Sequence, residues 1–138
     1  MGRILGSNIR NVFSVLDSVS GREIDLYYRM PLASERVAYE SAKFTIDKSG
    51  ELTSTLTEAR QEYGLLILEG FKKGGFHLPQ EDGSLKDFSS NPEDPDYLPG
   101  WKERIKEFAI DLVEVLAHRI LDGPVIIANQ EIQDKRKN

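Results

Sequence analysis

The chain of 138 residues has no cysteine, only two histidines and no long hydrophobic run. Without cysteine it has no disulfide framework, no thiolate metal site and no cysteine nucleophile. No apolar stretch approaches the roughly 20 residues that a membrane-spanning helix needs, so we expect no membrane partner. The net charge of −5 argues against binding to nucleic-acid phosphates, so we also expect no nucleic-acid partner.

What is present is the composition of one ordinary globular domain. Hydrophobic residues make up 39% of the chain and charged residues 30%. Such a balance supports a hydrophobic core, and the length falls within the roughly 100–200 residues of a typical domain. We therefore treat residues 1–138 as a single domain, with a flexible N-terminus (1–11) and a loose, polar C-terminal tail (130–138).

The negative charge is concentrated between Leu78 and Gly100. This stretch has six acidic residues against one lysine and holds four of the six prolines, whereas the rest of the chain is neutral. Since proline lacks an amide hydrogen and fixes φ, we expect an acidic, proline-rich loop at 79–98 without regular structure. It is either a mobile linker or a docking arm. In the second interpretation the partner-binding residues are Phe88, Glu93, Asp94, Asp96 and Tyr97, with the two aromatic rings as anchors.

Two strands are predicted near the N-terminus, at Val12–Leu16 and Ile24–Met30. In the second strand apolar residues alternate with polar ones, which places one face inward and the other outward. Gly21, in the turn-rich stretch between them, can adopt a positive φ, so the two strands are expected to form a β-hairpin. A lone hairpin is only marginally stable in water and must pack on other elements.

Helical spacing of apolar residues predicts three helices after the hairpin. The first begins at Ser34, a suitable N-cap, and ends before the glycine-containing break at 48–50. The second begins at Thr55 and Glu58, which match a capping box, and is stopped by the glycine pair at 74–75. Gly64 and Gly70 within it each weaken the helix by roughly 1 kcal/mol relative to alanine, and a glycine there permits close approach of another helix. The apolar stripe of the second helix comprises Leu56, Ala59, Tyr63, Leu66, Ile67 and Phe71.

The third helix is predicted from Pro99 to Asp122, where Gly123 and Pro124 stop it. A short strand at 125–128 would follow. The fold class is therefore α+β, with an N-terminal β-hairpin packed on a mainly helical core of about three helices. Helices two and three are expected to form a packed pair. The main apolar stripe of the third helix comprises Trp101, Ile105, Phe108, Leu112, Leu116 and Ile120.

Few residues point to catalysis. Asp111, Glu114 and His118 lie close together on the third helix and could bind a metal ion or relay a proton. Their spacing matches neither the di-iron motif nor the paired-histidine zinc motif, and a polar helix face with an i,i+4 pair is the simpler explanation. The acidic groups at 81–84 and 93–96 do not fit a calcium-binding loop. We expect no catalytic residue, no metal ligand and no cofactor, with a small metal-dependent enzyme as a third candidate function.

The stretch Glu58–Gly70, the break at 74–76 and the segment 100–104 resemble the small tail-assembly proteins of long-tailed bacteriophages and prophages. The preceding hairpin and Met30–Leu32 resemble the same layout, so the resemblance covers most of residues 12–121. It implies a non-enzymatic chaperone or assembly factor in the cytoplasm of the bacterial host. The implied partner is a tail protein, such as the tape-measure or tail-tube protein.

In this interpretation the working surface is the pair of broad apolar stripes on the second and third helices, which would cover apolar segments of the partner. Such surface also favours a homo-oligomer. The alternative function is a structural component of the virion, such as a connector or tail-completion protein, which would stay in the finished particle.

Overall fold

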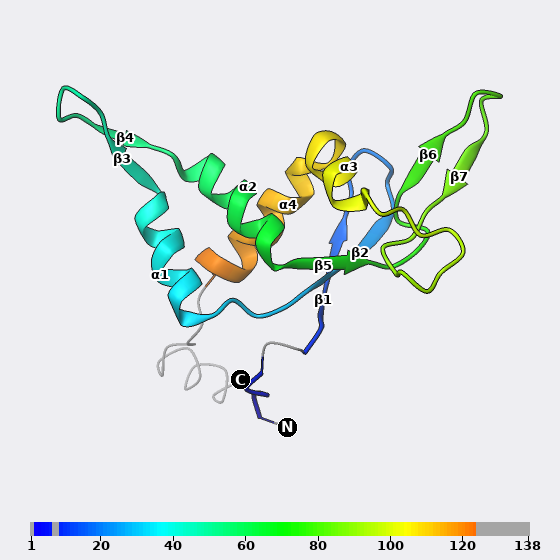
Figure 1. Cartoon of the computed structure of the whole chain (residues 1–138), viewed down its shortest axis with the longest axis horizontal. Helices are drawn as coiled ribbons and strands as arrows, with labels where there is room; N and C mark the ends of the chain where they lie inside the picture. Colours follow the sequence, from blue (N-terminus) through cyan, green and yellow to red (C-terminus); the bar gives the residue numbers. More distant parts are fainter. Residues whose placement is uncertain (1, 7–8, 124–138) are drawn as a thin grey trace, which may run out of the picture.

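The computed structural model describes residues 2–6 and 9–123. The strand expected at 125–128 and the tail at 130–138 lie outside these ranges. The fold is α+β, as predicted, with helices packed beside a central antiparallel sheet and two smaller hairpins at opposite ends of the molecule (Figure 1). Within the described part of the chain, no helix is both long and apolar enough to cross a membrane.

The central sheet has the strand order β1-β2-β5. Its first two strands are β1 (Asn11–Leu16) and β2 (Glu23–Tyr28), and they form the predicted antiparallel hairpin. The alternation of buried and exposed residues follows the sequence pattern, because Ile24 and Leu26 point into the core. Gly21 in the turn has a φ of +74°, a conformation that favours glycine.

Helix α1 (Ala33–Ala42) begins one residue before the predicted N-cap Ser34. Its start is fixed instead by Glu35, whose carboxylate accepts a hydrogen bond from the backbone N–H of Leu32 at 2.7 Å. The same carboxylate forms a bidentate ion pair with the guanidinium of Arg29, and both N···O distances are 2.7 Å. The ion pair therefore ties the end of β2 to the first turn of α1.

The break predicted at 48–50 is the turn of an unpredicted hairpin, so the prediction of a helix up to this break is wrong after Ala42. Its strands are β3 (Phe44–Ile46) and β4 (Leu52–Ser54). Asp47 closes the turn by accepting hydrogen bonds from the backbone N–H groups of Ser49 and Glu51, both at 2.9 Å. Gly50 in the turn has a φ of +84°.

Helix α2 (Leu56–Ile67) starts where predicted but ends well before the glycine pair at 74–75. Residues Leu68–Phe71 form strand β5, which pairs with β2, so the prediction of a helix through Phe71 is wrong. The predicted capping box is also absent: the hydroxyl of Thr55 donates to the carbonyl of Ala42 at 2.6 Å instead.

The acidic segment contains a third hairpin, with strands β6 (His77–Pro79) and β7 (Leu85–Asp87). The expectation that 79–98 has no regular structure is therefore wrong at Pro79 and at Leu85–Asp87. The hairpin forms because Gly83 adopts a φ of +85° and Asp82 accepts a hydrogen bond from the N–H of Ser84 at 2.9 Å.

The predicted third helix is divided. Helix α3 (Trp101–Phe108) ends at Ala109, whose φ of −141° and ψ of 34° are not helical. Helix α4 (Ile110–Ala117) follows and continues into a π-helical turn, His118–Asp122. The change of direction at Ala109 places Phe108 outside the core.

Helices α2 and α4 pack against each other, which confirms the predicted pair. Gly64 lies at the closest approach: a Cβ atom there would be 2.7 Å from both Cγ1 and the carbonyl oxygen of Val113. The main core lies between this helix pair, α3 and the central sheet. A smaller cluster joins α1 to the far end of the pair and comprises Tyr39, Ala59, Ala117 and Leu121.

Candidate functional site

The apolar stripes of α2 and α4, predicted as the working surface, are used mainly within the chain. Ile67, Leu112 and Leu116 are buried in the main core. Leu66 and Val115 keep part of their surface exposed, and Phe108 is 71% exposed. Other exposed apolar side chains lie elsewhere, among them those on the hairpins and on α3.

The first exposed apolar surface is one face of the β3–β4 hairpin, which projects from the body of the molecule (Figure 1). The strand register places Ile46 directly opposite Leu52, and Phe44 lies two residues from Ile46 on the same face. The exposed fractions are 52% for Phe44, 72% for Ile46 and 63% for Leu52. We call these three side chains the hairpin face. The pattern Phe-Thr-Ile, turn, Leu-Thr-Ser could have revealed it in the sequence.

The second is an apolar groove of about 310 Å³ between the β6–β7 hairpin and α3. The buried ring of Phe88 and the side chain of Ile105 belong to its lining. Phe108 belongs to it too and is largely solvent-exposed, because α3 ends there. The lining residues are Phe76, His77, Leu78, Pro79, Phe88, Arg104, Ile105, Phe108 and Ala109.

Arg104 is the one lining residue of this groove that carries a permanent charge. Its guanidinium carbon lies 5.7 Å from the centre of the Phe108 ring, within cation–π range. Among the residues that the structure describes, no carboxylate lies within ion-pair distance of it. His77, the other ionisable lining residue, pairs with Asp87 across the hairpin.

The residues predicted as a docking arm have different positions. Phe88 is only 4% exposed, and its ring packs edge-on against Phe71 at 5.3 Å between centroids. Tyr97 is half-buried against the same core. These two rings therefore hold the segment to the body, and that they also anchor a partner stays a prediction.

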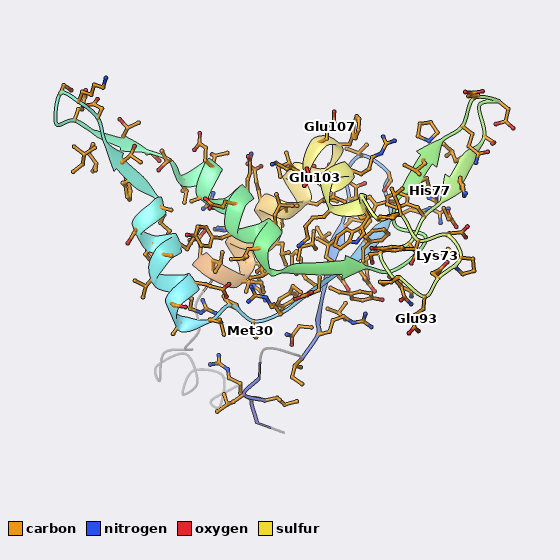
Figure 2. The ribbon with its side chains drawn as sticks, in the orientation of Figure 1. Met30, Lys73, His77, Glu93, Glu103 and Glu107 are labelled. Atoms are coloured by element: carbon orange, nitrogen blue, oxygen red, sulfur yellow. The ribbon has the colours of Figure 1, made fainter. Side chains whose placement is uncertain are left out.

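The acidic members of the predicted arm lie around one lysine. The Nζ of Lys73 is 3.0 Å from a carboxylate oxygen of Asp94 and 2.7 Å from one of Asp96. Glu93, the third acidic member, is exposed on the same loop (Figure 2). The ion pairs hold 94–96 to the turn after β5. That these residues bind a partner stays a prediction.

The three polar residues considered as a metal site are not brought together. Glu114 accepts a hydrogen bond from Gln61 at 3.0 Å, and His118 lies beside Asp122 and Arg60. Asp111 is exposed on the first turn of α4. Within residues 2–6 and 9–123, no group of three histidine, aspartate or glutamate side chains could hold a metal ion.

Asp122 is the centre of the largest polar network in the described part of the chain. Its carboxylate accepts a hydrogen bond from the hydroxyl of Tyr39 at 2.7 Å and contacts Lys43 and Arg60, each at 3.0 Å. Burial would raise the pKa of this carboxyl, but these hydrogen bonds outweigh burial and lower it to about 2. Burial and the bond to Asp122 raise the pKa of Tyr39 to about 12.

Acid is expected to destabilise the fold through two carboxylates. The hydrogen bonds from Arg29 lower the pKa of Glu35 to about 2, as the network lowers that of Asp122. Because both values lie below the ordinary ones of 4.5 and 3.8, the unfolded chain binds more protons in this range. Their stabilisation is therefore complete above about pH 5 and is lost as the pH falls towards 2.

Melting temperatures measured between pH 6 and pH 2.5 test this expectation. The melting temperature of the wild type should fall steadily below pH 5, and that of Glu35→Gln should fall less over the same interval, since the variant has lost one of the two groups. Equal slopes for the two proteins would contradict the assignment to Glu35.

No known protein family, curated protein or solved structure matches this chain.

Proposed function

We propose that this protein is a non-enzymatic assembly factor of a phage tail, which binds a tail protein in the cytoplasm of the bacterial host. The resemblance of Glu58–Gly70 and the segment 100–104 to small tail-assembly proteins supports the tail as the setting. The observation that carries the binding role is the hairpin face, where Phe44, Ile46 and Leu52 are exposed together on a projecting hairpin.

The physical argument is the cost of leaving this surface in water. Fully burying a large apolar side chain contributes roughly 1.5–3 kcal/mol, and exposed apolar patches mark interaction sites. The hairpin face makes no contribution to either core cluster. Its side chains therefore become stabilising only when another surface covers them.

Co-expression with the tape-measure and tail-tube proteins encoded in the same phage genome tests the proposal. One of the two should co-purify with the chain. Ile46→Ser should weaken that binding by about tenfold or more, because it removes one buried apolar anchor. Thr45→Ser, on the opposite face of the same strand, is the matched control and should bind as the wild type does. Failure of both tail proteins to bind, or equal binding by Ile46→Ser, would contradict the proposal.

Mass spectrometry of purified phage particles separates an assembly factor from a structural component. An assembly factor leaves before the tail is complete, so the chain should be absent from finished particles. A constant amount in every particle would favour the structural role instead.

A further inference from the structure

We propose that the outer edge of strand β1 is a dimerisation site, at which β1 of a second copy of this chain pairs antiparallel and extends the central sheet. The edge at β5 is already covered, because the hydroxyl of Ser90 accepts a hydrogen bond from the backbone N–H of Phe71 at 3.0 Å. In contrast, β1 pairs with β2 and with no other strand of the described ranges. The inference goes beyond the proposed function and does not depend on it, because it concerns the isolated chain.

Alternate residues of β1 direct their backbone groups away from β2. In an antiparallel pair, every second residue of a strand directs both its N–H and its C=O to the partner strand. Asp17, which directly follows β1, donates its N–H to the carbonyl of Arg22 at 2.9 Å, in the same register as the β1–β2 pair. The odd-numbered residues of β1 therefore bond to β2. The N–H and C=O groups of Val12, Ser14 and Leu16 point the other way, and no residue that the structure describes bonds to them.

Strand β1 lacks the features that usually keep an exposed edge from pairing. The segment Asn11–Leu16 contains no proline and no charged side chain, and its register with β2 has no bulge. The side chains of Val12 and Leu16 are both more than half exposed. An edge of this kind is a template on which another strand can pair.

A second copy of β1 matches this edge in the register centred on Ser14. A two-fold axis at Ser14 places Val12 of one copy opposite Leu16 of the other, and each opposed pair exchanges two hydrogen bonds. All the outward backbone groups of these three residues are then satisfied. On the opposite face of the sheet, Phe13 lies opposite Val15 of the second copy. Both are partly buried against the main core, so apolar packing continues across the axis.

Charge does not oppose this pairing. Arg10, which precedes the strand, would lie opposite the uncharged Ser18 of the second copy. The two Asp25 residues would be separated by three strand spacings, roughly 14 Å along the sheet, so salt weakens their repulsion. Each of these carboxylates also accepts a hydrogen bond from the hydroxyl of Ser14 in its own copy, at 2.7 Å. The structure favours a second copy as the occupant because β1 matches itself on both faces and in its backbone hydrogen bonds.

Analytical ultracentrifugation of the isolated chain tests the site. The wild type should show a monomer–dimer equilibrium with a dissociation constant on the order of 10 μM. Ser14→Pro removes an N–H that β2 does not use, so the monomer should stay folded while the dissociation constant rises by about tenfold or more. Ser14→Ala keeps this N–H and is the matched control. It should dimerise as the wild type does, and so should Ile46→Ser on the hairpin face.

Cross-linking tests the register independently of whether Ser14→Pro folds. Because the chain has no cysteine, Ser14→Cys introduces a single thiol. In the dimer the two Cα atoms at this position would be roughly 5.5 Å apart, within the range of a disulfide. Ser18→Cys is the control, because its two Cα atoms would be roughly 27 Å apart. Mild oxidation should therefore cross-link Ser14→Cys and leave Ser18→Cys as single chains on a denaturing gel.

Three results would overturn the inference. They are a wild type that is still monomeric at about 100 μM, ten times the expected dissociation constant, a folded Ser14→Pro variant that dimerises as the wild type does, and equal cross-linking of the two cysteine variants. If the wild type is monomeric and Ser14→Pro weakens binding of the tail protein, a foreign strand occupies the edge and the assignment to a second copy is wrong. Failure of the proposed function is distinguishable, because dimerisation is measured without any tail protein.

Discussion

Replacing Asp122 by alanine is expected to lower the free energy of unfolding by about 3 kcal/mol. The carboxylate satisfies the buried hydroxyl of Tyr39 and is the shared acceptor for Lys43 and Arg60. Its side chain is only 11% exposed, so water replaces it poorly. Alanine would leave two cations close together and a hydroxyl without its acceptor, and both penalties act in the same direction.

Two further variants separate the charge from the hydrogen bonds. Asp122→Asn keeps the shape and an acceptor oxygen but removes the negative charge, so it should cost less than alanine. Tyr39→Phe removes one hydrogen bond and should cost about 1 kcal/mol. These free energies can be measured by urea unfolding. The comparison is valid if the dependence of the free energy of unfolding on urea concentration is the same for all variants. An Asp122→Ala variant as stable as Tyr39→Phe would show that the two cations do not depend on this carboxylate.

The Asp122 network could not have been predicted from the sequence. Its members are separated by as many as 83 positions, from Tyr39 to Asp122. The sequence identifies Asp122 only as part of a helix stop. The packing of α1 and α2 against the π-helical turn brings these residues together, and this tertiary packing cannot be read from local sequence patterns.

Local patterns predicted the elements that depend on local forces. The alternation in 24–30 gave the β1–β2 hairpin correctly, and Gly64 correctly indicated the close approach of a second helix. The helical spacing before Ile67 was equally reliable. In each case the signal lies within one or two turns of helix or one strand length.

The errors occur where pairing partners are distant in sequence. Leu68–Phe71 satisfies a helical stripe, but its backbone pairs with β2, which the sequence alone does not place beside it. Ala109 interrupts a segment with good helical spacing and without glycine or proline. There α3 packs Trp101 on Phe71, at 5.9 Å between the ring centroids, while α4 packs on α2, and one straight helix does not serve both contacts.

The candidate sites include residues whose environment was not predicted correctly from the sequence. Phe108 was assigned to the main apolar stripe of one long third helix; in the structure α3 ends at this residue, which is largely exposed. Phe88 was singled out as a large ring in a polar segment, and the sequence alone did not show that this ring is buried against the core. Ile46 and Leu52 lie in a sequence pattern typical of a hairpin, but no hairpin was predicted there.

Replacing Gly64 by alanine is expected to destabilise the protein by about 1–2 kcal/mol. The new Cβ would lie 2.7 Å from both Cγ1 and the carbonyl oxygen of Val113, and 3.2 Å from Cβ of Ala117. The side-chain atom of Val113 can rotate away, but the carbonyl oxygen moves only if α4 shifts as a whole. Overpacking of this kind costs roughly 1–3 kcal/mol, against a gain of about 1 kcal/mol in helix propensity.

The sign of the effect is the decisive observation. At an exposed helical position the same substitution stabilises, because alanine has the higher helix propensity and restricts the unfolded chain. Gly100→Ala is the control for steric contact, since nothing lies within 4 Å of its Cβ; because Gly100 is the N-cap of α3, this substitution should cost no more than about 1 kcal/mol, through the cap alone. Adding Val113→Ala to Gly64→Ala would remove the side-chain contact and leave the backbone contact, so it should not restore stability. A stabilised Gly64→Ala variant would mean that α2 and α4 lie farther apart than the structure places them.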